Sequence, residues 1–121
     1  MDYLMVAIGG ALGTLARFWF AAFMVSLTGP SFPWGTLIIN VVGSFAIGVF
    51  DSWTQTGAFI HLSHHMAVFT MVGICGGFTT FSSFSLQTLD LFRGKRALWA
   101  IAYVVSSVVL CLAGVWVGTK L

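Results

Sequence analysis

The sequence predicts an all-α integral membrane protein with four transmembrane helices. Hydrophobic residues fill 59% of its 121 positions and charged residues only 7%, whereas about a quarter of the residues in a soluble domain are charged. The mean hydropathy is +1.01. A bilayer core about 30 Å thick requires about 20 apolar residues per helix, so the chain has room for roughly four spans. We therefore expect residues 1–121 to form one four-span membrane domain.

The first span is predicted at about residues 3–27, because Pro30 and Pro33 make continuation of the helix costly. Asp2 stands where a secretory signal would carry a basic residue, so the segment is interpreted as a span. Arg17 lies inside it, and its default role is to anchor the helix at the far interface. The alternative role is a fixed positive charge at an aqueous vestibule, where it would concentrate anions.

The second span, about residues 35–53, places Asn40 within the membrane. Thr36 and Ser44 stand four residues before and after it, so the three polar side chains share one helix face. An amide in hydrocarbon is costly unless it is hydrogen bonded. Asn40 is therefore either a clasp between helices, which is the commoner role, or a donor to a permeating solute.

The third span, about residues 66–91, is the unusual one. Gly76 and Gly77 weaken its helix, and five of the seven residues 79–85 carry hydroxyl groups. A break at the glycines in mid-membrane would free carbonyls that coordinate a small cation and amides that favour an anion. The alternative is that the glycines allow close helix packing while the hydroxyls bond back to preceding carbonyls.

Three phenylalanines follow the glycines at intervals of three residues: Phe78, Phe81 and Phe84. Such spacing forms one slowly turning stripe along a helix. An aromatic stripe is more often a packing surface than a functional one. The functional interpretation uses the positive edge of the aromatic ring, which can face an anion while the ring excludes water.

The fourth span, about residues 97–118, carries a narrow polar seam. Tyr103, Ser107 and Cys111 are four residues apart and share one helix face. This seam is either a packing seam or part of a polar path. Cys75 and Cys111 lie in apolar stretches without a metal-binding or redox spacing, so we interpret both as reduced packing residues.

Charges outside the spans leave the orientation open. The turn between spans three and four holds Arg93, Lys95 and Arg96, and the opposite side holds Lys120. The positive-inside rule favours a cytoplasmic turn, but so small a difference is compatible with both orientations. The loop before the third span holds His61, His64 and His65; an interfacial cluster is expected there, although this spacing can in principle hold a metal.

Several function classes are excluded or weakened. A net charge of +2 is too small and too scattered for nucleic-acid binding. The sequence has no paired carboxylates and no GxSxG, HExxH or P-loop motif, so we predict that it is not an enzyme. No carboxylate falls at mid-span, which weakens an ion-coupled pump. Because so few helices rarely enclose a pore alone, any pathway is expected between subunits.

Over essentially its full length, the chain resembles the Fluc (CrcB) fluoride channel family. The resemblance lies in residues 9–13 leading to Arg17, in residues 35–37 leading to Asn40 and Gly43, and in the specific run GGFTTFSSFS at 76–85. It implies a passive, fluoride-selective ion channel that exports fluoride and protects the cell from its toxicity. The implied location is the cell inner (plasma) membrane, crossed several times.

The resemblance also implies how the channel is assembled. Family members are antiparallel, dual-topology homodimers with two fluoride pathways along the interface and a central structural sodium ion. Backbone carbonyls of Gly76 and Thr79 would bind the sodium. The residues assigned to the fluoride pathway are Arg17, Asn40, Phe81, Ser83, Phe84, Tyr103 and Ser107. Three positions depart from the family pattern: Phe18, Ser83 and Cys111, of which Cys111 stands where a small hydroxyl residue or glycine is expected.

Two other hypotheses belong to different classes. A small antiparallel multidrug exporter has a similar size, but it requires a membrane-embedded glutamate for proton coupling, and the chain contains no Glu. A non-transporting tetraspan assembly protein would use its glycines and phenylalanines only for packing. Substitution of Phe81 or Asn40 would then change oligomer stability without changing ion flux.

Overall fold

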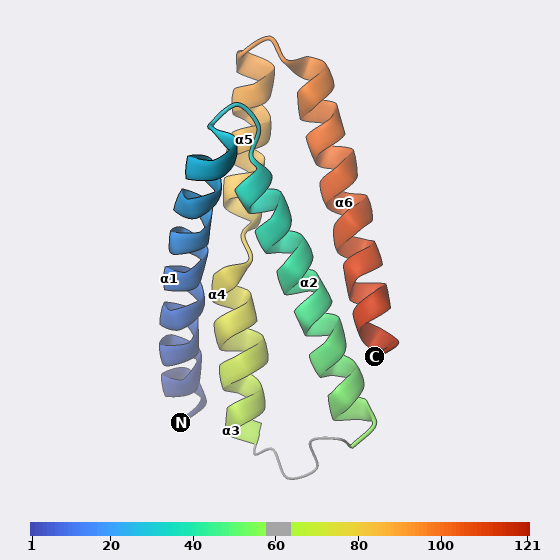
Figure 1. The fold of residues 1–121 in the computed structure, drawn as a ribbon. Helices are drawn as coiled ribbons and strands as arrows, with labels where there is room; N and C mark the ends of the chain where they lie inside the picture. Colours follow the sequence, from blue (N-terminus) through green and yellow to red (C-terminus); the bar gives the residue numbers. More distant parts are fainter. Residues whose placement is uncertain (58–63) are drawn as a thin grey trace.

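The computed structural model describes residues 1–57 and 64–121, and these residues form helices joined by short turns (Figure 1). Each long helical segment begins and ends close to the polar or proline-containing boundaries of an apolar run. The elements are α1 (Asp2–Thr28), α2 (Trp34–Gln55), α3 (His64–Ala67), the π-helix η1 (Val68–Cys75), α4 (Gly76–Phe78), α5 (Phe81–Arg93) and α6 (Ala97–Thr119).

The described residues contain four segments that are long and apolar enough to cross a membrane: α1, α2, α6 and the segment His64–Arg93. Each predicted span end lies within two residues of the corresponding end in the structure. Large apolar side chains cover the outside, for example Leu98 at 82% exposure and Phe18 at 76%. Such a surface suits lipid or a protein partner. The prediction of a four-span, multi-pass membrane protein is confirmed.

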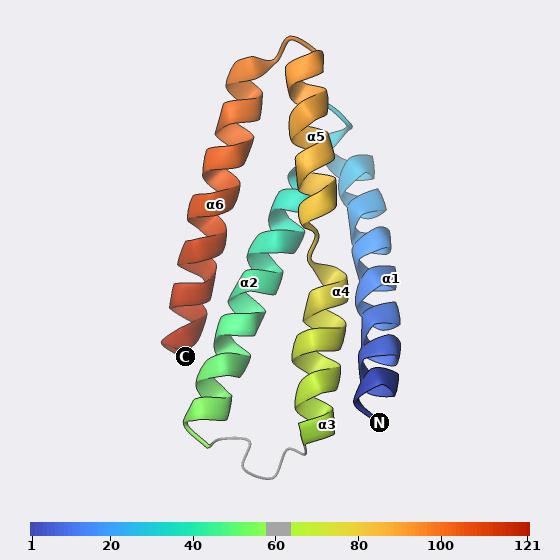
Figure 2. The same ribbon diagram turned by 180° about the vertical axis from the view of Figure 1, so that it is seen from behind.

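The spans run alternately up and down (Figures 1 and 2). The N-terminus, the end of α2, α3 and the end of α6 lie towards one end of the bundle, and the α1–α2 connection and the α5–α6 turn lie at the other. The most extensive packing joins α2 to α6 and α1 to η1. A small buried core near the α1–α2 connection contains Phe32, Leu37, Leu91, Ala100 and Tyr103.

Helix α1 packs on η1 and α4 with backbone directly against backbone. A Cβ atom at Gly13 would collide with the carbonyl oxygen of Ile74 and lie 2.9 Å from the Phe78 nitrogen. A Cβ atom at Gly77 would lie 2.5 Å from the carbonyl oxygen of Gly10. Both glycines are therefore required for the close approach of these helices, as small residues are in many membrane bundles.

The structure distinguishes between the two interpretations of Gly76 and Gly77. Gly76 and Gly77 are both helical, and the extended backbone lies at the next two residues, with φ −78° and ψ 156° at Thr79 and φ −152° and ψ 118° at Thr80. The contact with α1 explains why Gly77 lacks a side chain, so its presence indicates close packing and not a break. The π-helix η1, which precedes the glycines, was not predicted.

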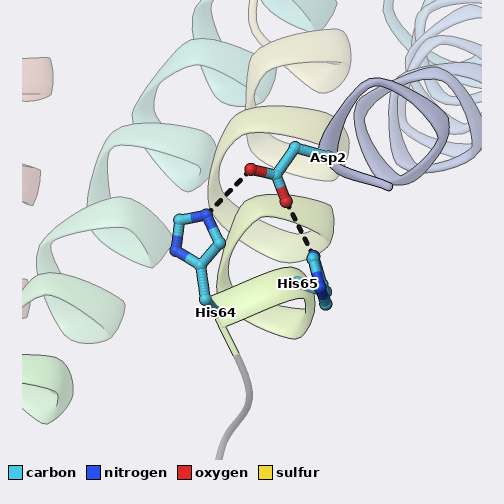
Figure 3. Close-up of polar contacts among 3 residues, drawn as sticks. All are labelled: Asp2, His64 and His65. Carbon is cyan, nitrogen blue, oxygen red and sulfur yellow. Dashed lines mark hydrogen bonds and ion pairs between the residues drawn. The ribbon is translucent and has the colours of Figure 1, made fainter.

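Asp2 joins the first helix to α3 (Figure 3). Its carboxylate oxygens lie 2.9 Å from Nε2 of His64 and 2.7 Å from Nδ1 of His65. His61, the third histidine of the predicted cluster, lies outside the described residues. Among the described residues, no group of three or more His, Cys, Asp or Glu side chains is arranged to hold a metal. The contacts of Asp2 with His64 and His65 therefore tie α1 to α3.

We expect Asp2→Asn to lower the melting temperature of the detergent-solubilised protein more than Asp51→Asn does. The two carboxylate oxygens of Asp2 each contact a histidine ring on α3, whereas an asparagine amide has only one acceptor oxygen. Asp51→Asn is the control, because Asp51 accepts a hydrogen bond from Gln55 and has no histidine partner in the described structure. An equal decrease for the two variants would contradict this prediction.

Candidate functional site

The extended segment Thr79–Thr80 is fixed by Asn40 on α2. The Asn40 amide Nδ2 donates to the Thr80 carbonyl oxygen at 3.0 Å, and the Thr80 backbone nitrogen donates to Asn40 Oδ1 at 2.8 Å. One side chain thus pairs both backbone groups of a residue outside regular helix. Asn40 acts as a clasp between α2 and the third span. An amide carries two N–H donors, and within the described residues one bond from this amide, to Thr80, is formed.

The hydroxyl groups that follow Thr79 cap the resumed helix α5. Thr80 Oγ1 accepts from the Ser83 backbone nitrogen at 3.2 Å, which is the usual bond of a helix N-cap. The same oxygen lies 3.2 Å from both Ser82 Oγ and Ser83 Oγ. Three hydroxyl groups therefore gather at the N-terminus of α5, where the helix dipole favours negative charge.

Two carbonyl oxygens near the extended segment lack their usual helical donors. In an uninterrupted α-helix, the N–H of Thr80 would bond to Gly76 and that of Ser83 to Thr79. Here the Thr80 N–H donates to Asn40 and the Ser83 N–H donates to Thr80 Oγ1. Neither carbonyl receives another backbone donor within the described residues. They are the two carbonyls that the family resemblance would assign to sodium, and free carbonyl oxygens are suitable sodium ligands.

An open cavity of about 360 Å³ lies beside this segment. It collects side chains from α2, from the segment Cys75–Phe84 and from α6. The lining residues are Asn40, Gly43, Ser44, Ile47, Cys75, Gly76, Thr79, Thr80, Phe81, Phe84, Ser107, Val108 and Cys111. The structure therefore brings six predicted site residues to one cavity: Asn40, Gly76, Thr79, Phe81, Phe84 and Ser107. Their roles stay predictions.

Aromatic rings extend from this cavity into the core. The ring centroids of Phe81 and Phe84 are 5.5 Å apart, and those of Phe84 and Tyr103 are 5.2 Å apart. Phe81 is 78% exposed, whereas Tyr103 is fully buried and its hydroxyl donates to Gln87 Oε1 at 3.1 Å. Tyr103 therefore lies behind Phe84 and not in the cavity lining. The outermost ring, Phe81, faces away from the chain's own core.

Ser107 presents a buried hydroxyl group without a partner. The residue is only 6% exposed, and its Oγ has no hydrogen bond within the described structure. Most buried hydroxyls in proteins are paired, so an unpaired one requires an explanation. Because Ser107 lines the cavity, its hydroxyl is available to a solute or water there.

Two further predicted residues lie outside the lining. Ser83 reaches the cavity only through its bonds to Thr80 Oγ1. Arg17 is half-buried on α1, does not line the cavity, and forms no ion pair with a described carboxylate. Sequence reasoning missed Thr80, although the pattern Thr80-Phe-Ser-Ser83 is a typical helix N-cap. It also missed Gln87, the partner of Tyr103, because no motif in the sequence marks this residue.

A protein-family model described as "CrcB-like protein, Camphor Resistance (CrcB)" matches residues 4–119, nearly the whole chain. The chain belongs to the CrcB-like family. A CrcB-like relative in Rhodospirillum rubrum, named fluoride-specific ion channel FluC, is 52% identical over 118 residues, which are 98% of this chain and 92% of the relative. The protein of the same name in Methylocella silvestris is also 52% identical over 118 residues, 98% of this chain and 90% of the relative.

A third CrcB-like relative extends the comparison. The fluoride-specific ion channel FluC of Paramagnetospirillum magneticum is 48% identical over 118 residues, 98% of this chain and 92% of the relative. The resemblance inferred from the sequence motifs is therefore confirmed. This is a family of ion channels, so the prediction that the CrcB-like chain is not an enzyme is also confirmed.

Proposed function

We propose that the chain is a passive, fluoride-selective ion channel that lets a cell expel fluoride across its inner (plasma) membrane. The names of its closely similar relatives support the choice of ion. The observation that carries the proposal is the cavity in which a buried, unpaired Ser107 hydroxyl meets the Asn40 amide and two phenylalanine rings. These groups are hydrogen-bond donors and positive ring edges, which are what a desolvated anion requires.

Fluoride selectivity follows from the cost of dehydration. Fluoride is small and strongly hydrated, so a pathway must replace its lost water with close donors. Ser107 Oγ and the second N–H of Asn40 are two such donors in the same cavity. Between these two donors, the ring edges of Phe81 and Phe84 would contact the anion, and the rings would exclude water. No described residue that lines the cavity carries a carboxylate, which would repel an anion.

The complete channel would be an antiparallel, dual-topology homodimer with two pathways along its interface. One chain leaves the cavity open at its side and Phe81 78% exposed. A second copy laid over this face would close the cavity and cover the ring. A two-fold arrangement repeats every contact, so it produces two equivalent pathways. The small charge difference between the two ends is compatible with insertion in both orientations.

A structural sodium ion would lie where the two extended segments meet. Each chain offers two carbonyl oxygens without backbone donors, those of Gly76 and Thr79. Two ligands are too few to replace the hydration shell of the cation, and the second copy would supply two more. The bound ion would join the two helix interruptions and add positive potential near the anion sites.

The decisive experiment is efflux from liposomes that contain the purified protein. Vesicles are loaded with fluoride or chloride, a potassium ionophore removes the voltage, and ion-selective electrodes record release. We expect release of fluoride without release of chloride. If a folded, dimeric protein released neither ion, the homodimeric channel would be rejected in favour of a missing partner or a packing role.

We expect Phe81→Ile to impair fluoride efflux while the dimer remains intact. Isoleucine keeps apolar bulk but has no aromatic edge to face an anion. Efflux is measured in liposomes, and dimerisation by cross-linking in the same membranes. Phe92→Ile is the matched control, because Phe92 is also exposed on α5, at 47%, but does not line the cavity. Unchanged efflux in Phe81→Ile would show that the Phe81 ring is not needed for fluoride conduction.

A further inference from the structure

The α5–α6 turn concentrates positive charge at one end of the molecule. Arg93 ends α5, and Lys95 and Arg96 follow before α6 begins at Ala97. Arg93 and Lys95 are exposed. Three cationic side chains therefore lie within four residues, at the end of the bundle opposite the N-terminus (Figure 1).

Within the described residues, no carboxylate forms an ion pair with these cations. Ion pairs in the described part of the chain join Asp2 to His64 and His65, at the opposite end (Figure 3). Asp90, the carboxylate on α5, forms no ion pair with Arg93 in the described structure. An unpaired positive turn beside the apolar surface of a membrane protein faces the phosphate groups of the lipids.

The turn is also held in a defined shape. Backbone hydrogen bonds of 2.9 Å from Gly94 to Asp90 and 2.9 Å from Arg96 to Leu91 close it. Lys95 adopts a left-handed backbone conformation with φ 59°. The Arg96 guanidinium donates to the Ser31 carbonyl oxygen in the α1–α2 connection. The charges are therefore placed by a closed turn and not by a loose loop.

Aromatic side chains lie next to the charges. The Arg96 guanidinium carbon is 5.4 Å from the centre of the Trp99 ring. Trp99 is 52% exposed and Trp34 is 42% exposed, and both rings pack on Phe32, with centroid distances of 5.7 Å and 4.7 Å. Exposed tryptophans are typical of the level at which lipid headgroups meet the hydrocarbon. Their position places the cationic turn at the depth of lipid phosphate.

We propose that the turn Arg93–Arg96, with Trp34 and Trp99 beside it, is a binding site for the headgroup of an anionic phospholipid. The lipid phosphate would accept hydrogen bonds from Arg93, Lys95 and the remaining N–H groups of Arg96, which suit phosphate oxygens. The glycerol and acyl chains would pack along the tryptophans and α6. This inference does not depend on which ion the protein conducts.

The test measures the melting temperature of the detergent-solubilised full chain with added phosphatidylglycerol, phosphatidylcholine or inorganic phosphate. We expect phosphatidylglycerol to raise the melting temperature most. The double variant Arg93→Gln/Lys95→Asn should lose at least half of that increase, and asparagine suits the left-handed backbone at position 95. Lys120→Gln should retain the full increase, because Lys120 also lies over a tryptophan, 5.4 Å from the Trp116 ring, but outside the proposed site.

Three results would overturn the site: an undiminished response of the double variant, an equal response to phosphatidylcholine, or an equal response to inorganic phosphate. The last would show a free-anion site instead of a lipid site. If the double variant has a lowered melting temperature without lipid, the single variant Arg93→Gln is tested in its place, because Arg93 is exposed at the helix end. Native mass spectrometry then counts retained phosphatidylglycerol, which should decrease for Arg93→Gln but not for Lys120→Gln.

Discussion

Replacement of Gly13 by alanine is expected to abolish fluoride efflux and to lower the thermal stability of the protein strongly. The added methyl group would occupy the position of the Ile74 carbonyl oxygen. Because the obstacle is backbone, it cannot move aside as a flexible side chain would. Helix α1 must then separate from η1 and α4, which lead directly into Thr79 and Thr80. Overpacking of this kind costs about 1–3 kcal/mol in well-packed interiors.

The control for this prediction lies on the same helix. Gly10→Ala adds the same methyl group at a position where the Gly73 carbonyl oxygen would lie 4.0 Å away, an ordinary van der Waals contact. Melting in detergent and efflux from liposomes should therefore separate the two variants clearly. Equal behaviour of Gly10→Ala and Gly13→Ala would show that the close contact does not decide the fold.

Asn40→Ala is expected to reduce fluoride efflux at least about tenfold. The substitution removes both hydrogen bonds to the Thr80 backbone and leaves its N–H and carbonyl without partners. A buried polar group left without a partner costs about 1–3 kcal/mol, and a cost of about 1.4 kcal/mol already corresponds to a factor of ten. The substitution also removes the amide donor from the cavity.

Asn40→Asp separates the clasp from the donor role. A protonated carboxyl group can both accept from the Thr80 nitrogen and donate to the Thr80 oxygen, whereas the ionised form can only accept. The melting temperature of Asn40→Asp should therefore approach that of the native protein at low pH and decrease as the carboxyl group ionises. Asn40→Ala lacks a titrating group at this position and should show no such trend relative to the native protein. A trend in both variants would contradict the clasp.

The sequence predicted the spans well because their signal is local. Hydrophobic length, Pro30 and Pro33, and the basic turn at 93–96 are sufficient to place helix ends to within two residues. The same local signals left the role of the glycines in the third span open. Gly76 and Gly77 could equally mean flexibility or close packing, and only the position of α1 decides between them.

The residues of the candidate site could be predicted from the sequence, but the hydrogen bonds between them could not. Asn40, Phe81, Phe84 and Ser107 were selected by residue type and motif, and the structure brings them to one cavity. The pairing of Asn40 with Thr80 depends on the relative height of two helices, which a single sequence does not contain. The π-helix η1 could not be predicted for a similar reason. Its wider turns reflect packing between spans more than residue preference.

The glycines between α1 and the third span also affect how the protein assembles. Ordering a long side chain at an interface costs up to about 2 kcal/mol in rotamer entropy, whereas glycine has no rotamers to lose. Gly9, Gly13, Gly73 and Gly77 can therefore dock without that penalty. Glycine also has no side chain that could adjust to a shifted register, so the close approach at these four positions forms only in register. Assembly of α1 should accordingly be all-or-none, with few partly docked states in the membrane.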